Sequence, residues 1–179
     1  YITYNNQINQ QINEHFKINM HSRYPRQIAF IKEDGDKLNV EYNIDMFEHV
    51  VSRSGSRPII FVSCLGRYQQ GKSTINSGIT GNYGYVIGNG SKETTKGVYI
   101  DGPYDINYLY QRFNISIRED MYFEGNEILS PLIYFFDIEG YDGSMHGSDL
   151  EKNNKAFIEM CTPFLCLSSI FILVSEPNA

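Results

Sequence analysis

The sequence of 179 residues lacks long hydrophobic runs and is short of basic side chains. Apolar stretches such as residues 58–62 and 170–174 have the length of a strand, whereas a membrane-spanning helix needs about 18 or more apolar residues. The 15 Lys and Arg residues are outnumbered by 21 Asp and Glu residues, which gives a net charge of −6. This balance argues against a surface that coats nucleic acid or anionic lipid, so an anionic ligand has to be held locally.

Cysteine is also scarce. Cys64, Cys161 and Cys166 are too few and too irregularly spaced for a disulfide framework or a zinc site. Because all three stand in apolar contexts, we expect buried thiols in a reducing, cytoplasmic environment. The start of the sequence has neither the basic nor the apolar region of a secretory signal. It also has no initiator Met, so we expect a piece of a longer protein.

The length and the 41% content of hydrophobic residues suit one globular domain. We expect residues 1–26 to be a polar extension and residues 27–179 to form the domain. The patterns predict a β-hairpin around Asp34-Gly35 and three helices, one within residues 43–55, a short one after residue 74, and one from Ser148 to Pro163. They predict buried strands at residues 58–65, 132–136 and 167–175, and further strands at residues 97–101 and 110–120. Buried strands that alternate with helices indicate an α/β fold with a mostly parallel sheet and helices on both faces.

Residues 66–73, GRYQQGKS, match the phosphate-loop pattern G-x-x-x-x-G-K-[ST] in full. In such a loop the glycines let backbone N–H groups face inward, and the following helix directs its positive end at the phosphates. Lys72 bridges the β- and γ-phosphates, and the Ser73 hydroxyl binds Mg²⁺. Since the loop lies between a predicted buried strand and a predicted helix, the sequence predicts a P-loop NTPase three-layer sandwich preceded by the hairpin.

Two further segments fit the same chemistry. Asp137 follows a hydrophobic strand, where it can hold Mg²⁺ through water, and the N–H of Gly140 can contact the γ-phosphate and respond to its loss. Between the two segments, Thr95 of the ETTKG sequence can add its hydroxyl to the magnesium shell, a choice over Thr94 that depends on the resemblance described next.

The ordered set GRYQQGKST, GNGSKETTKGVYI, FFDIEGYDG and LSSIFILV resembles the guanylate-binding protein and atlastin group of dynamin-like large GTPases, from about residue 25 onward. This resemblance implies a GTPase that binds GTP with Mg²⁺, self-associates through its nucleotide face, and serves a membrane or an assembly through regions outside this sequence. No nucleic-acid partner is expected. The implied phosphate-binding residues are Gly66, Arg67, Tyr68, Gln69, Gln70, Gly71, Lys72, Ser73 and Thr74. The implied switch residues are Thr95, Asp137, Glu139 and Gly140, and the implied catalytic residues are Lys72, Thr95, Glu139, Gln69 and Arg67. Ser73, Thr95 and Asp137 are implied at the metal.

Three features depart from the family's pattern. Gln69 stands where the family usually has an arginine finger, and Arg67 is the alternative candidate for that role. Glu93 stands where the family commonly has Ser. The sequence also ends before the guanine-reading Arg-Asp motif, so the preference for guanine is inferred from kinship.

The first two departures keep a second hypothesis open, a GTP-binding scaffold or assembly component with weak or no hydrolysis. An ATP-using enzyme such as a small-molecule kinase is disfavoured because no cluster of arginines follows the loop.

Overall fold

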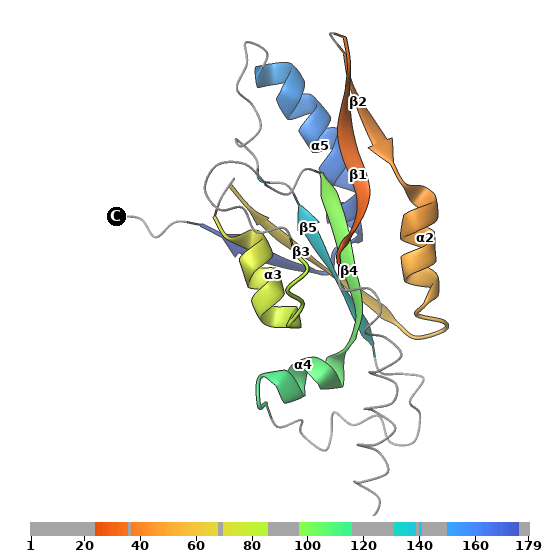
Figure 1. The fold of residues 1–179 in the computed structure, drawn as a ribbon, viewed down its shortest axis with the longest axis vertical. Coiled ribbons are helices and arrows are strands. Elements are labelled where there is room, and N and C mark those ends of the chain that lie inside the picture. The colour runs from red at the N-terminus through yellow and green to blue at the C-terminus, as the bar shows by residue number, and fades with distance from the viewer. Residues whose placement is uncertain are drawn as a thin grey trace, which may run out of the picture.

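A computed structural model describes residues 24–35, 37–67, 70–85, 97–115, 131–138, 140 and 150–175. These residues form a six-stranded sheet and the helices that pack on it (Figure 1). The elements are β1 (Arg26–Asp34), β2 (Lys37–Tyr42), α2 (Ile44–Ser52), β3 (Ile59–Gly66), α3 (Lys72–Thr80), β4 (Val98–Asp105), α4 (Ile106–Arg112), β5 (Leu132–Ile138), α5 (Leu150–Leu167) and β6 (Ile170–Val174). Within the described residues, none of the helices combines the length and the apolar character that crossing a membrane requires.

The predicted β-hairpin is confirmed. β1 and β2 pair antiparallel from Ala29↔Tyr42 to Asp34↔Lys37. Gly35, in the connection, has a φ of +57°, a left-handed conformation that glycine adopts without the steric cost other residues meet. The helix that follows begins after Asn43, whose side chain accepts a hydrogen bond from the N–H of Met46 at 3.1 Å. This is an N-cap, and it sets the start of α2.

The prediction of a mostly parallel P-loop NTPase sandwich is wrong. The strand order is β2-β1-β4-β5-β3-β6, and three of its five pairs, β1 with β2, β1 with β4 and β4 with β5, are antiparallel. Val98 at the start of β4 pairs with Ile138 at the end of β5, so β4 runs against its neighbour. An apolar strand has the same sequence pattern in either direction, so its direction depends on the path of the connecting chain, which the pattern does not contain.

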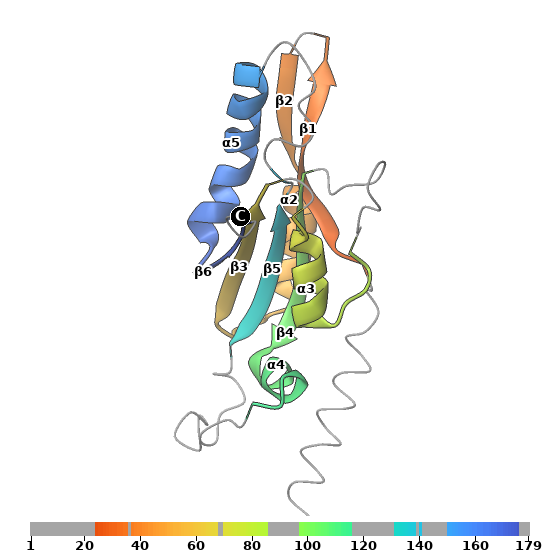
Figure 2. The same ribbon diagram turned by 90° about the vertical axis from the view of Figure 1, so that its left-hand side faces the viewer.

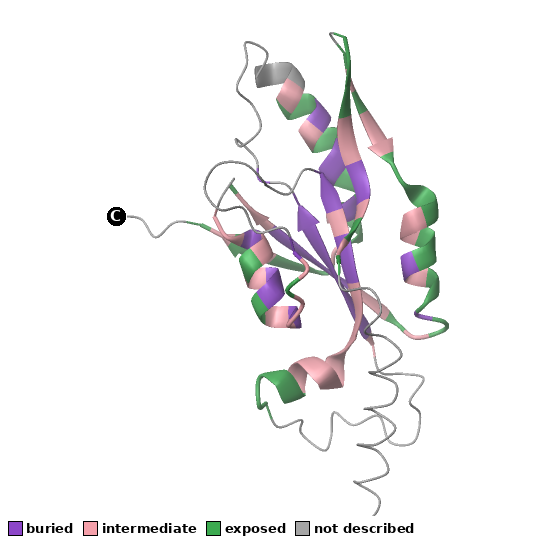
Figure 3. Cartoon of the chain, viewed as in Figure 1, coloured by how far each residue is buried: buried purple, intermediate pink, exposed green. Residues whose placement is uncertain are grey.

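The sheet separates two hydrophobic clusters. One joins α2 and α5 to the sheet through residues such as Val50, Phe136 and Phe164, and its rings stack closely, with centroids 4.9 Å apart for Phe61 and Phe136. The other lies against α3 and α4. Figure 2 shows the helices on the two sides of the sheet, and Figure 3 shows the burial concentrated in the central strands. β5 is buried along its whole length, which gives the site described below a rigid base.

Helix α5 continues through Pro163, where the sequence predicted its end. A proline inside a helix has no N–H for the carbonyl four residues earlier, here that of Glu159. The Tyr42 hydroxyl, at the end of β2, donates a hydrogen bond to that carbonyl at 2.8 Å. A side chain distant in sequence therefore satisfies the group that Pro163 leaves free, and the helix runs on to Leu167.

Three other expectations are corrected. The segment 110–120 does not start as a strand, because α4 extends to Arg112 and Asn114 has a left-handed φ of +52°. The last strand, β6, is the edge strand of the described sheet and leaves Leu173 76% exposed, so it is not buried on both faces. Cys166 is exposed, while Cys64 and Cys161 are buried as expected.

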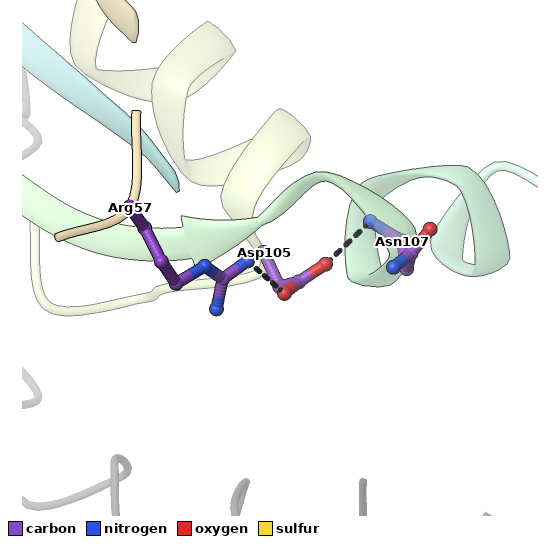
Figure 4. Close-up of polar contacts among 3 residues, drawn as sticks. All are labelled: Arg57, Asp105 and Asn107. Atoms are coloured by element: carbon purple, nitrogen blue, oxygen red, sulfur yellow. Dashed lines mark hydrogen bonds and ion pairs between the residues drawn. The ribbon is translucent and has the colours of Figure 1, made fainter. Parts of the chain in front are cut away.

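Helix α4 is fixed at its start by Asp105. One carboxylate oxygen accepts the N–H of Asn107 at 2.8 Å, and the other pairs with the Arg57 guanidinium at 2.5 Å (Figure 4). Asp105 is thus both the N-cap of α4 and a half-buried ion-pair partner, and it sets the residue at which this helix begins.

Candidate functional site

The phosphate-loop sequence joins the end of β3 to the start of α3. At Gly66 a Cβ atom would lie 2.5 Å from the carbonyl oxygen of Val174, so β6 can pair with β3 here because residue 66 has no side chain. Gly71 has a φ of +82° and forms the N-cap position of α3. Both glycines of the motif therefore have a steric reason in this fold, one a close backbone approach and the other a left-handed turn into the helix.

Two side chains of the motif hold the described part of the loop. The Gln70 Oε1 accepts the N–H of Arg67 at 2.8 Å, and the Lys72 Nζ donates to the carbonyl of Arg67, also at 2.8 Å. Lys72 is 7% exposed, so its ammonium group is drawn back over the loop instead of extending into solvent. The motif's lysine consequently lies beside the loop backbone and the first turn of α3.

Ser73 and Asp137 are 64 residues apart in the sequence and meet across two elements. The parallel pairing of β3 with β5 places Cys64 opposite Asp137, so Asp137 reaches the level at which the chain leaves β3 for the loop. The Ser73 hydroxyl donates to Asp137 Oδ2 at 2.6 Å, a distance typical of a hydroxyl bonded to a carboxylate. Asp137 is 3% exposed. The structure thus brings together two of the three residues that the sequence assigned to the metal, and the third, Thr95, lies outside the described residues.

Asn76 is a member of this cluster that the sequence analysis missed. Its Nδ2 donates to Asp137 Oδ1 at 3.2 Å, and the residue is fully buried. Its own Oδ1 accepts no hydrogen bond within the part of the chain that the structure describes. The available signal was spacing, because residues three apart on a helix lie on one face and Asn76 follows Ser73 by three positions.

The pKa of the Cys64 thiol shows the effect of the charges on Asp137 and Lys72. Burial, followed by the nearby Asp137 carboxylate, raises the pKa of the Cys64 thiol to about 12, while Lys72 acts in the opposite direction. The thiol therefore stays protonated at neutral pH. It is an inert neighbour of the cluster and not a nucleophile.

The remaining candidates are divided between described and undescribed parts of the chain. Thr74 is exposed on the first turn of α3, Arg67 is exposed at the start of the loop, and Gly140 is buried just beyond β5. Tyr68, Gln69, Thr95 and Glu139 lie outside the described residues, as do Glu93 and the predicted helix start at Ser148.

A second buried carboxylate was also missed. Asp101 on β4 is 6% exposed, and its oxygens accept hydrogen bonds from Asn82 Nδ2 at 3.1 Å and from the Tyr104 hydroxyl at 2.7 Å. Burial raises the pKa of Asp101, and these hydrogen bonds act in the opposite direction. Asn82 follows α3, so this cluster ties the end of that helix to β4.

Comparison with protein families and with curated proteins identified no relative of this chain. No protein-family model matches the chain, and no curated protein is similar to it at a significant level. The functional argument therefore depends on the site itself and on the motifs.

Proposed function

We propose that the chain binds a guanine nucleotide with Mg²⁺ through the phosphate loop and hydrolyses GTP to GDP and phosphate. The observation that carries the proposal is the 2.6 Å contact between Ser73 and Asp137, beside Lys72 and the start of α3. It joins a phosphate-loop hydroxyl to a carboxylate from a different motif, as a nucleotide–magnesium site requires.

Two features near the start of α3 can attract the phosphates of a nucleotide. The N–H groups in the first turn of α3 point out of the helix end, and the helix dipole favours an anion there. Lys72 adds a full positive charge at the same turn. In a chain with a net charge of −6, this local arrangement meets the requirement that an anion be held locally.

The donor groups fit Mg²⁺. This ion prefers oxygen ligands and usually binds through one or two carboxylates, substrate phosphates and several waters. Ser73 and Asp137 supply a hydroxyl and a carboxylate. Among the described residues no group of three or more His, Cys, Asp or Glu side chains gathers into a metal cluster. When bound, Mg²⁺ would neutralise phosphate charge.

The choice of guanine and the hydrolysis step come from the resemblance to the guanylate-binding protein and atlastin group. In this proposal Thr95 and Glu139 serve as switch and catalytic residues, Gly140 contacts the γ-phosphate, and Gln69 or Arg67 takes the place of the family's arginine finger. Self-association through the nucleotide face belongs to the same proposal.

The test is a titration of the chain with a non-hydrolysable GTP analogue in Mg²⁺, with an ATP analogue as competitor. We expect binding that ATP does not displace. Lys72→Ala removes the cation at the loop and should abolish binding, whereas Lys155→Ala, a matched change at an exposed position of α5, should leave it intact. Absence of binding to the unaltered chain would refute the proposal, and displacement by ATP would refute its guanine preference.

Gln69 favours a second candidate, a GTP-binding scaffold with weak or no hydrolysis, because a neutral amide cannot replace the charge of an arginine finger. Phosphate release from GTP distinguishes the two. Under the scaffold hypothesis Gln69→Arg should raise hydrolysis strongly, and a substantial rate in the unaltered chain would exclude this second candidate.

A further inference from the structure

Asp137 is held by two side chains from one face of α3. Ser73 donates to its Oδ2 at 2.6 Å and Asn76 donates to its Oδ1 at 3.2 Å. Each donor engages a different oxygen, so together they define the plane of the carboxylate as well as its place. Removing Asn76 therefore takes away the donor that holds Oδ1.

The burial of Asn76 is costly for the fold. The residue is fully buried, and its Oδ1 accepts no hydrogen bond from the described residues. A buried polar atom without a partner is destabilising, and an apolar side chain of similar shape avoids this cost. Leucine has such a shape but no donor, so what the amide adds at this position is its bond to Asp137.

We propose that Asn76 is a positioning residue that orients Asp137 for the magnesium-dependent binding of the nucleotide. The inference rests on the proposed function and deepens it. Asn76 holds Oδ1, and Oδ2 stays turned towards Ser73 and the phosphate loop. Groups that orient a metal ligand in this way typically change metal affinity 10- to 100-fold when they are removed.

The test measures binding and not turnover. The full chain is titrated with Mg²⁺ at a fixed concentration of a fluorescent, non-hydrolysable GTP analogue, and the Mg²⁺ concentration at half-maximal binding is recorded. Asn76→Leu removes the amide and keeps the approximate volume. Asn76→Ala is the second variant, because it requires no extra space if leucine does not fit. Ser77→Ala is the control, a buried position on the same helix.

We expect both Asn76 variants to need about tenfold more Mg²⁺ or more, and Ser77→Ala to match the unaltered chain. Melting temperatures without ligand show that each variant is folded at the temperature of the titration. Asn76→Leu removes the unpartnered Oδ1 but also the donor to Asp137 Oδ1, so we expect it to melt below the unaltered chain and to stay folded during the titration, while its Mg²⁺ requirement rises.

The outcomes that overturn the inference are distinct. If the unaltered chain binds the analogue and a folded Asn76 variant has the same Mg²⁺ requirement, the role of Asn76 is refuted and the proposed function stands. If the unaltered chain binds no analogue, the proposed function is refuted and the inference falls with it.

Discussion

The contact between Ser73 and Asp137 should stabilise the free protein as well as form the site. Ser73→Ala, studied without nucleotide or Mg²⁺, removes the hydroxyl that donates to Asp137 Oδ2 at 2.6 Å. Asp137 is 3% exposed, so water cannot readily replace the lost donor. A hydrogen bond to a charged group contributes about 1.5–3 kcal/mol. Since Asn76 still donates to the carboxylate, we expect a loss of about 2 kcal/mol in the free energy of unfolding.

Urea denaturation measures this loss, and thermal melting checks it. In a chain of this size 1 kcal/mol corresponds to about 2–4 °C, so Ser73→Ala should melt about 4–8 °C lower. Ser52→Ala is the matched control, because it removes a helical serine hydroxyl that bonds the His49 carbonyl at 2.9 Å at an exposed position. Its effect should stay within about 0.5 kcal/mol.

A double-mutant cycle with Asp137→Ala isolates the pair. If the contact is formed as the structure shows, the two single changes should couple by about 1–2 kcal/mol, within the range found for residues in direct contact. Additive effects of the two changes, or a Ser73→Ala variant as stable as Ser52→Ala, would refute the reasoning. The site geometry would then have to be revised before any nucleotide experiment is interpreted.

Three further predictions concern stability and reactivity. Tyr42→Phe should cost about 1 kcal/mol in urea unfolding, since it removes the donor that satisfies the carbonyl freed by Pro163, and an unchanged midpoint would contradict this role. Burial raises the folded-state pKa of Asp101, so the stability that its protonated form contributes is lost as the pH rises through that pKa. The unfolding free energy of Asp101→Asn relative to the unaltered chain should therefore increase between about pH 4 and about pH 7, and a difference independent of pH would argue against the raised pKa. Of the three cysteines, exposed Cys166 should react with a thiol reagent in the native chain while the buried two are protected; rapid labelling of Cys64, whose pKa is about 12, would show that its surroundings are more open than the structure indicates.

Much of the local structure could be predicted from the sequence, because it is encoded in neighbouring residues. Asp34-Gly35 predicts the hairpin turn, and the apolar runs predict β3 and β5. The spacing of Gly66, Gly71 and Lys72 predicts the loop and the helix after it. Each of these depends on steric rules or patterns that operate within a few residues.

The failed predictions are those in which a residue distant in the sequence determines where a helix begins or ends. The end of α5 was placed at Pro163 because the sequence does not show that Tyr42 lies beside Glu159. The sequence predicts a strand from residue 110 onward, but Asp105, held by Arg57, caps a helix that extends to Arg112. In both places a local preference is overruled by a contact formed between elements.

For the candidate site, the sequence by itself determined the chemical groups: a glycine loop, a lysine, a hydroxyl and a carboxylate in separate motifs. Only the tertiary structure decided which of them meet. The parallel pairing of β3 with β5 places Asp137 next to Ser73, and Asn76, on the same face of α3 as Ser73, donates to the same carboxylate. The mixed direction of the sheet was likewise decided at this level, since burial fixes which residues are apolar, whereas strand direction follows from how the connecting chain packs.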